Sequence, residues 1–205
     1  GSIQLYNEPN WNNKINIGIN QRFGSFADYQ TNVRVKYGSQ RWQGSTNVIY
    51  HSAKNDFPYK NVVKIDTPVE RQKSAEVEQY HILQELYYKI NTRNFLSARV
   101  WLLKSNRNIP PSLTSPDSYA SLLNETSRSL LEWKRYFKNN GLFILRTAYI
   151  NDLTNYTDTI AAINSDHKTQ SVKNQVRITQ PLGKKIVLLA GVDYDIELAR
   201  SDGYE

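Results

Sequence analysis

Residues 80–103, "YHILQELYYKINTRNFLSARVWLL", decide the fold. Apolar and polar side chains alternate on both sides of the central "NTRN", with Tyr88 before it and Leu96 after it on the apolar side. Because successive side chains of a strand point to opposite faces, each half predicts a β-strand with one apolar and one polar face. Asn-rich tetrapeptides favour tight reversals, so the whole stretch predicts an antiparallel hairpin.

The same alternation recurs along the chain, whereas helical periodicity is nearly absent. It predicts nine strands at approximately residues 14–23, 30–38, 42–53, 74–90, 94–106, 125–137, 141–153, 169–180 and 184–199. Many of them exceed the usual strand length of about 5 or 6 residues. In the last one, a row from Ile186 to Leu198 is apolar and the reverse side is acidic. The sequence therefore predicts an all-β, antiparallel up-and-down meander.

The expected connections alternate in length. Short reversals occur at "GSQR", "NTRN", "KNNG" and "PLGKK", while residues 54–73, 107–124 and 154–168 form long polar segments; "GSFADY" is a brief exception. Outer-membrane barrels have short turns at one end, long loops at the other, apolar side chains toward lipid and polar ones toward the lumen. On this hypothesis the lumen-facing residues are Arg99, Arg128, Arg146, Arg177, Asp193, Asp195 and Glu197.

Aromatic residues flank the short reversals. Amphipathic rings prefer the level where acyl chains meet headgroups, because the ring leaves water while its polar group stays hydrated. The lipid-interface aromatics predicted in this way are Tyr37, Trp42, Tyr88, Phe137 and Phe143. Aromatic residues also fill the cores of soluble β-sandwiches and β-barrels, so a soluble protein remains an alternative.

Bulk properties exclude some classes of protein. The 205 residues suffice for one or two domains. No apolar run reaches the roughly 18 to 20 residues of a spanning helix. The absence of Cys excludes disulfides and thiolate metal sites. The formal charge of +7 suits nucleic acid, anionic lipid or an acidic ligand. "GSIQLYNEPN" has no secretory-signal pattern, so the protein is expected to be cytosolic or to have its signal outside this sequence.

Catalytic and metal chemistry find little support. Asp193, Asp195 and Glu197 could hold a divalent cation or act as acid and base. Pairing with arginines such as Arg177 or Arg146 in a lumen is the preferred interpretation. The three histidines are scattered without metal-ligand spacing. We therefore predict no enzyme, cofactor or metal site. Nucleic-acid binding is not predicted either, since basic and aromatic residues mostly occupy opposite faces.

Two motifs resemble a known family. "GSFADYQTNVRVKYG", residues 24–38, resembles the first hairpin in the barrel of TonB-dependent outer-membrane receptors of the kind common in Bacteroidetes. "NRNIPPSLT", residues 106–114, resembles the Arg-x-Ile-Pro segment that often follows their fifth strand. Family barrels have 22 strands, so the resemblance implies part of a 22-stranded transmembrane β-barrel, covering about its first nine strands. The plug domain is missing and the chain stops at "SDGYE", which implies a fragment.

The resemblance also implies a function and a location. A receptor of this family resides in the outer membrane and imports a large nutrient, of siderophore, cobalamin or glycan class, with energy coupled through TonB. TonB and the receptor's own plug domain would be partners outside this chain, and the ligand would contact the long loops. The candidate contact residues are Tyr59, Arg71, Arg107 and Tyr119. A soluble all-β ligand- or glycan-binding module and a passive porin-like channel remain the alternatives.

Overall fold

The computed structural model describes residues 9, 11, 14–114, 117–183 and 185–202, and within them all regular structure is β-strand. The strands are β1 (Asn16–Phe23), β2 (Tyr29–Gly38), β3 (Trp42–Ala53), β4 (Pro58–Lys60), β5 (Val69–Arg71), β6 (Val77–Asn91), β7 (Asn94–Ile109), β8 (Ala120–Tyr136), β9 (Leu142–Asp158), β10 (Ile163–Leu182) and β11 (Ile186–Ser201). The predicted all-β class is confirmed.

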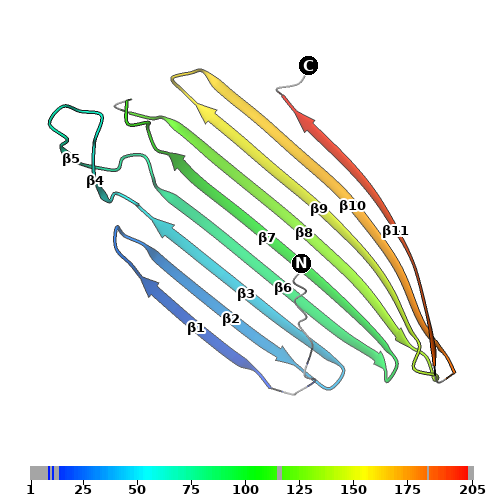
Figure 1. Cartoon of the computed structure of the whole chain (residues 1–205). Coiled ribbons are helices and arrows are strands. Elements are labelled where there is room, and N and C mark those ends of the chain that lie inside the picture. Colours follow the sequence, from blue (N-terminus) through cyan, green and yellow to red (C-terminus); the bar gives the residue numbers. More distant parts are fainter. Residues whose placement is uncertain (1–8, 10, 12–13, 115–116, 184, 203–205) are drawn as a thin grey trace.

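Nine of these strands form one sheet in the order β1-β2-β3-β6-β7-β8-β9-β10-β11, and every neighbouring pair is antiparallel. The meander topology is therefore confirmed. Figure 1 shows a broad, twisted sheet with β1 and β11 at its two edges. Short turns lie at one end, here called the turn end. The long connections and the small β4–β5 hairpin lie at the other, called the loop end (Figure 1).

Two expectations about loops are wrong. Residues 154–168 are not a long loop, because β9 and β10 continue through them and only residues 159–162 join the two strands. β7 and β8 likewise extend into the expected loop 107–124 and leave residues 110–119 as the connection, whereas the expected long connection 54–73 is present and contains β4 and β5. From Thr154 to Asp158 in β9 both faces carry polar groups, so the alternation that marks a strand disappears although backbone pairing continues. Thr154, for example, donates to the Asn124 side chain across the strands. Lys184, where the last strand was expected to begin, lies outside the described residues.

Cross-strand register sorts the side chains of the large sheet into two faces. One row of paired residues across β3 to β11 comprises Gln43, Tyr87, Ser97, Glu132, Arg146, Gln175 and Asp193. We call the side that carries this row the polar face. All seven residues predicted to face the lumen share it. The opposite side, here called the apolar face, carries rows such as Trp42, Tyr88, Leu96, Trp133, Leu145, Val176 and Val192.

Burial on these two faces is the reverse of that in a soluble sheet. On the polar face Glu85 is 5% exposed and Glu132 is 6% exposed. On the apolar face Val100 is 40% exposed and Leu131 is 58% exposed. Within the described residues no large side chain is fully buried, so this part of the chain has no hydrophobic core. The side chains that pack best are polar ones.

The turns are staggered across the sheet. The β2–β3 pairing ends at Gly38–Gln43, in the row of Asp193, whereas the β10–β11 pairing continues for seven residues past that row, from Asp193 to Ile186. The two turns are six strand spacings apart in the sheet order. If all the turns of this end lie in one plane, the strands must be tilted against the normal of that plane. A shift of seven residues along the strands over six inter-strand spacings corresponds to a tilt of about 40°.

Candidate functional site

Aromatic rings border the apolar face at the turn end. Tyr37 and Trp42 pack edge to face with ring centroids 5.7 Å apart, and Trp133 packs in the same way on Phe143 at 5.6 Å. Tyr88 pairs with Trp42 across β3 and β6. The predicted interface aromatics thus gather near the turns. The fifth, Phe137, follows the end of β8, with the Arg135 guanidinium over its ring at 5.5 Å.

A second aromatic border lies toward the loop end. The rings of Phe23, Tyr29, Tyr50 and Tyr80 form a chain with successive centroid distances of 5.3, 6.2 and 5.0 Å. The hydroxyls of Tyr50 and Tyr80 both donate to Glu78 Oε1, at 3.0 and 2.8 Å. The surface between the two aromatic borders is here called the apolar band. Eight residues separate Trp42 from Tyr50 along β3, so with strands tilted by about 40° the apolar band is roughly 20 Å high.

The polar side chain of Gln84 interrupts the apolar rows, and the structure explains how it is accommodated. Thr46 Oγ1 donates to Gln84 Oε1 at 2.6 Å, and Gln84 Nε2 donates to the Tyr37 hydroxyl at 3.2 Å. Both partners are on the same face, Thr46 on the neighbouring strand β3 and Tyr37 on β2, the next strand beyond it. A polar group that is hydrogen-bonded in this way costs little to remove from water.

Glu132 is the centre of a network on the polar face. Its carboxylate accepts from Arg146 Nε, forms an ion pair with Lys134 Nζ at 3.2 Å and accepts a longer hydrogen bond from Ser97 at 3.4 Å. Arg146 also donates to Gln175 at 2.9 Å, which extends the network across four strands. A second group lies beside it. There Arg99 forms an ion pair with Glu85 at 3.4 Å.

The acidic row of β11 is paired only in part as expected. Asp193 accepts from Gln175 at 2.8 Å and lies 4.0 Å from Arg177, whereas Arg146 binds Glu132 instead. Asp195 pairs with Lys173 at 3.2 Å, a partner that the sequence did not indicate. Glu197 makes no ion pair with any described residue. Arg128 is 3.5 Å from Asp152, and its guanidinium lies 4.9 Å from the centre of the Trp101 ring.

A cavity of about 480 Å³ lies at the loop end. It is lined by Tyr59, Asn61, Lys64, Glu70, Arg71 and Lys73 from β4, β5 and their flanks, and by Pro111, Leu113 and Thr114 after β7. Glu70 organises it, because its carboxylate accepts from the Tyr59 hydroxyl at 3.2 Å, from Asn61 Nδ2 at 3.0 Å and from Lys64. Asn61 is only 2% exposed, and its Oδ1 accepts a hydrogen bond from the Val63 backbone amide at 3.1 Å, which fixes the loop.

Electrostatics within this cluster favour its charged form. Hydrogen bonds from Lys64 and Asn61 lower the pKa of Glu70, and the bond to Glu70 raises the pKa of Lys64. Desolvation, followed by the hydrogen bond to Glu70, raises the pKa of the Tyr59 phenol. At neutral pH the cluster is therefore a neutral phenol, a carboxylate and an ammonium group.

The structure brings together two of the four predicted ligand-contact residues. Tyr59 and Arg71 line the loop-end cavity, and Arg71 also forms an ion pair with Asp56 at 3.2 Å. Arg107, near the end of β7, and Tyr119, just before β8, are exposed and are not among its lining residues. The sequence missed Asn61, Lys64, Glu70 and Lys73. β4 and β5 have three residues each, too few for alternation to reveal the hairpin that gathers these side chains.

Comparisons with known proteins give no family. No protein-family model matches the chain, and no curated protein is similar to it. Among the described residues, no helix is long and apolar enough to span a bilayer. The same residues contain no group of three or more His, Cys, Asp or Glu side chains that could hold a metal ion.

Proposed function

We propose that this chain is part of the wall of a transmembrane β-barrel in the outer membrane. The observation that carries the proposal is the inverted burial: apolar side chains such as Leu131 are exposed while Glu85 and Glu132 are packed away. An exposed apolar surface of this extent marks a membrane or a protein interface. In a barrel, lipid covers that surface and the polar face lines the lumen.

Two further features support a barrel wall rather than one layer of a soluble sandwich. The apolar band is bordered by aromatic rings at both ends, as the two lipid–water interfaces require. The staggered turns correspond to a tilt of about 40°, within the range of roughly 35–45° for barrel strands. Sandwich sheets bury one face against a partner layer and need neither an aromatic border nor staggered turns.

We further propose the specific role of a TonB-dependent receptor that imports a large nutrient. Support comes from the two motifs, which fall where the resemblance implies: residues 24–28 connect β1 to β2, and residues 106–114 include the end of β7, the fifth strand of the sheet. The loop-end cavity offers aromatic, charged and amide groups to a solute arriving from outside. The plug domain and TonB are the proposed partners.

A spin-label scan tests the barrel wall. The chain has no Cys, so single cysteines can be introduced at consecutive positions Leu96, Ser97, Ala98, Arg99 and Val100 without removing native thiols. In lipid vesicles, nitroxides at 96, 98 and 100 are expected to collide with lipid-soluble oxygen. Those at 97 and 99 are expected to collide with a water-soluble nickel complex. Ser112→Cys in the exposed loop is the control for full water access.

Shielding of the apolar-face labels would reject the proposal. If labels at 96, 98 and 100 are shielded from both reagents, these positions lie in a protein core and the soluble binding module is correct.

The importer is tested separately, in cells that carry the complete receptor and depend on an iron–siderophore, cobalamin or a glycan. Growth should cease when TonB is removed. Growth that persists without TonB favours a passive channel.

A further inference from the structure

The short turns at the turn end carry charges of one sign only. Each of them contains Lys or Arg, and none contains Asp or Glu. These turns are residues 38–42, 91–94, 137–141 and 183–185. The long connection 54–73 at the loop end, by contrast, contains both acidic and basic residues. The turn end is therefore the basic end of the sheet (Figure 1).

Backbone hydrogen bonds link neighbouring turns and place their arginines along one line. The Lys89 amide donates to the Arg41 carbonyl oxygen at 2.7 Å, and the Tyr136 amide donates to the Arg93 carbonyl oxygen at 2.8 Å. Arg135 directly precedes Tyr136 and lies on the apolar face. Arg41, Arg93 and Arg135 therefore follow one another across the turn end, and we call them the turn arginines.

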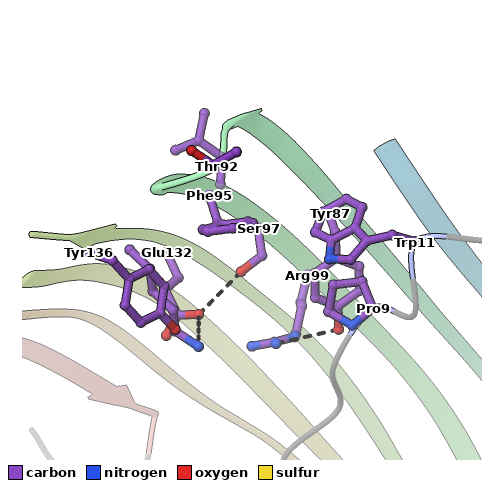
Figure 2. A pocket seen from close by; sticks show the side chains of 11 residues that line it. Pro9, Trp11, Tyr87, Thr92, Phe95, Ser97, Arg99, Glu132 and Tyr136 are labelled. Atoms are coloured by element: carbon purple, nitrogen blue, oxygen red, sulfur yellow. Dashed lines mark hydrogen bonds and ion pairs between the residues drawn. The ribbon is translucent and has the colours of Figure 1, made fainter. Parts of the chain in front are cut away.

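Polar-face cations near this end are neutralised within the protein, whereas the turn arginines are not. Figure 2 shows Arg99 directed toward Tyr87, and Ser97 directed toward Glu132. Arg99 also forms its ion pair with Glu85. None of the turn arginines forms an ion pair with a residue that the structure describes. Their charge is available to an anion from outside the chain.

A hollow of about 700 Å³ lies on the apolar face close to these arginines. Ala98 lines it, and register places this small side chain between Leu86 and Leu131, which are 44% and 58% exposed. Trp42 and Trp133 line it in the next row toward the turns. The apolar lining favours a hydrocarbon occupant.

We propose that the hollow and the turn arginines together bind an anionic phospholipid of the phosphatidylglycerol class. An acyl chain lies in the hollow, and the turn arginines bind the phosphate. A guanidinium group can donate two parallel hydrogen bonds to a phosphate. Along β8 only about 7 Å separates Trp133 in the hollow from Arg135, so one lipid can reach both. The inference rests on the proposed membrane location and adds a lipid preference that a barrel wall does not require.

Brominated lipids test the site with the full chain in phosphatidylcholine vesicles. The chain has four tryptophans, so with Trp11→Phe and Trp101→Phe the emission comes from Trp42 and Trp133 at the hollow. Bromine on an acyl chain quenches an adjacent indole. At equal mole fraction, dibrominated phosphatidylglycerol should quench about two- to fivefold more effectively than dibrominated phosphatidylcholine, because the basic turns enrich the anionic lipid.

Two other outcomes are distinguishable. Equal quenching by the two lipids would overturn the lipid site and leave the barrel wall intact. No quenching by either lipid would overturn both, because the apolar face would then meet no lipid.

Paired charge variants test the phosphate contact. Arg93→Gln combined with Arg135→Gln should at least halve the preference for phosphatidylglycerol. The matched control is Lys54→Gln combined with Lys60→Gln, which removes two exposed cations of the loop end and should leave the preference unchanged. An equal loss in both pairs would show that net charge, and not the turn arginines, attracts the lipid.

A filled hollow tests the acyl-chain contact. Ala98→Phe places a ring in the hollow and should also at least halve the preference for phosphatidylglycerol. Val100→Phe is the matched control, because Val100 lies on the same face of β7 but outside the lining of the hollow. A preference that survives unchanged in Ala98→Phe would show that the lipid does not occupy the hollow.

Discussion

Glu132 on β8 and Arg146 on β9 are direct register partners, and the Arg146 guanidinium donates to a carboxylate that is almost fully shielded from solvent. The carboxylate of an ion pair on the polar face is therefore among the best-shielded groups of the sheet. It lies on the reverse of a surface covered with exposed aliphatic side chains. Both observations agree with the arrangement proposed above, in which water would lie on the polar side and lipid on the apolar side.

Removing the charge of Glu132 should destabilise the sheet. Glu132→Gln leaves Arg146 and Lys134 without their carboxylate partner, so the free energy of unfolding should fall by about 1–3 kcal/mol. Urea titration of the folded chain in lipid vesicles measures this loss. The matched control is Glu125→Gln on the same strand, whose ion pair with Lys104 is exposed and should be worth about 0–1 kcal/mol. Equal losses in the two variants would contradict a special role for Glu132.

Adjacent leucines on β8 separate the membrane hypothesis from the soluble one. Leu131 is on the apolar face and Leu130 on the polar face, in the row of Arg99. In a bilayer, Leu131→Arg should cost about 2–4 kcal/mol of folding free energy near the midplane. Leu130→Arg should cost much less, because its side chain faces water. The measurement is urea unfolding in vesicles of defined lipid. If Leu131→Arg is harmless, no lipid covers this face.

The loop-end hairpin should respond to pH at both extremes. Glu70 has a lowered pKa, so its stabilisation is fully present above its ordinary value of 4.5 and is lost as the pH falls through the lowered pKa. Lys64 has a raised pKa, so its stabilisation is present below 10.5 and is lost as the pH rises through the raised value. The NMR signal of the Asn61 side-chain amide should report both transitions.

Two variants sharpen this prediction. Glu70→Gln should remove the acid transition, since Tyr59, Asn61 and Lys64 then have no carboxylate to bind. Asp66→Asn lies in the same loop but outside the cavity lining, and it should leave the transition in place. An acid transition that survives in Glu70→Gln would mean that another group controls the hairpin.

Gly44 should tolerate no side chain. It pairs with Tyr37 across β2 and β3, and a Cβ at this position would lie 2.6 Å from the Tyr37 ring. Gly44→Ala should therefore lower the free energy of unfolding by about 1–3 kcal/mol. Adding Tyr37→Leu should restore part of that loss. Gly18→Ala is the control, because nothing lies within 4 Å of its Cβ; it should be neutral or stabilise the strand by up to about 1 kcal/mol.

The sequence by itself determined the alternating part of each long strand and the face that each residue in it joins. Alternation is a local property, since neighbouring side chains of a strand must point to opposite sides. For that reason the expected strand 42–53 coincides with β3, and the seven expected lumen residues share one face. Where both sides of a strand are polar, as from Thr154 to Asp158, alternation disappears, and the sequence therefore predicted a loop instead of a strand.

The tertiary structure decided the partners. Arg146 binds Glu132 rather than the acidic row of β11 because register places Glu132 directly opposite it, and register depends on how far each hairpin is staggered against the next. The contact of Trp11 with Phe95 and the cavity around Glu70 join segments that are distant along the chain or strands too short to show a period. Local pattern encodes neither of these, because both depend on where the backbone returns in space.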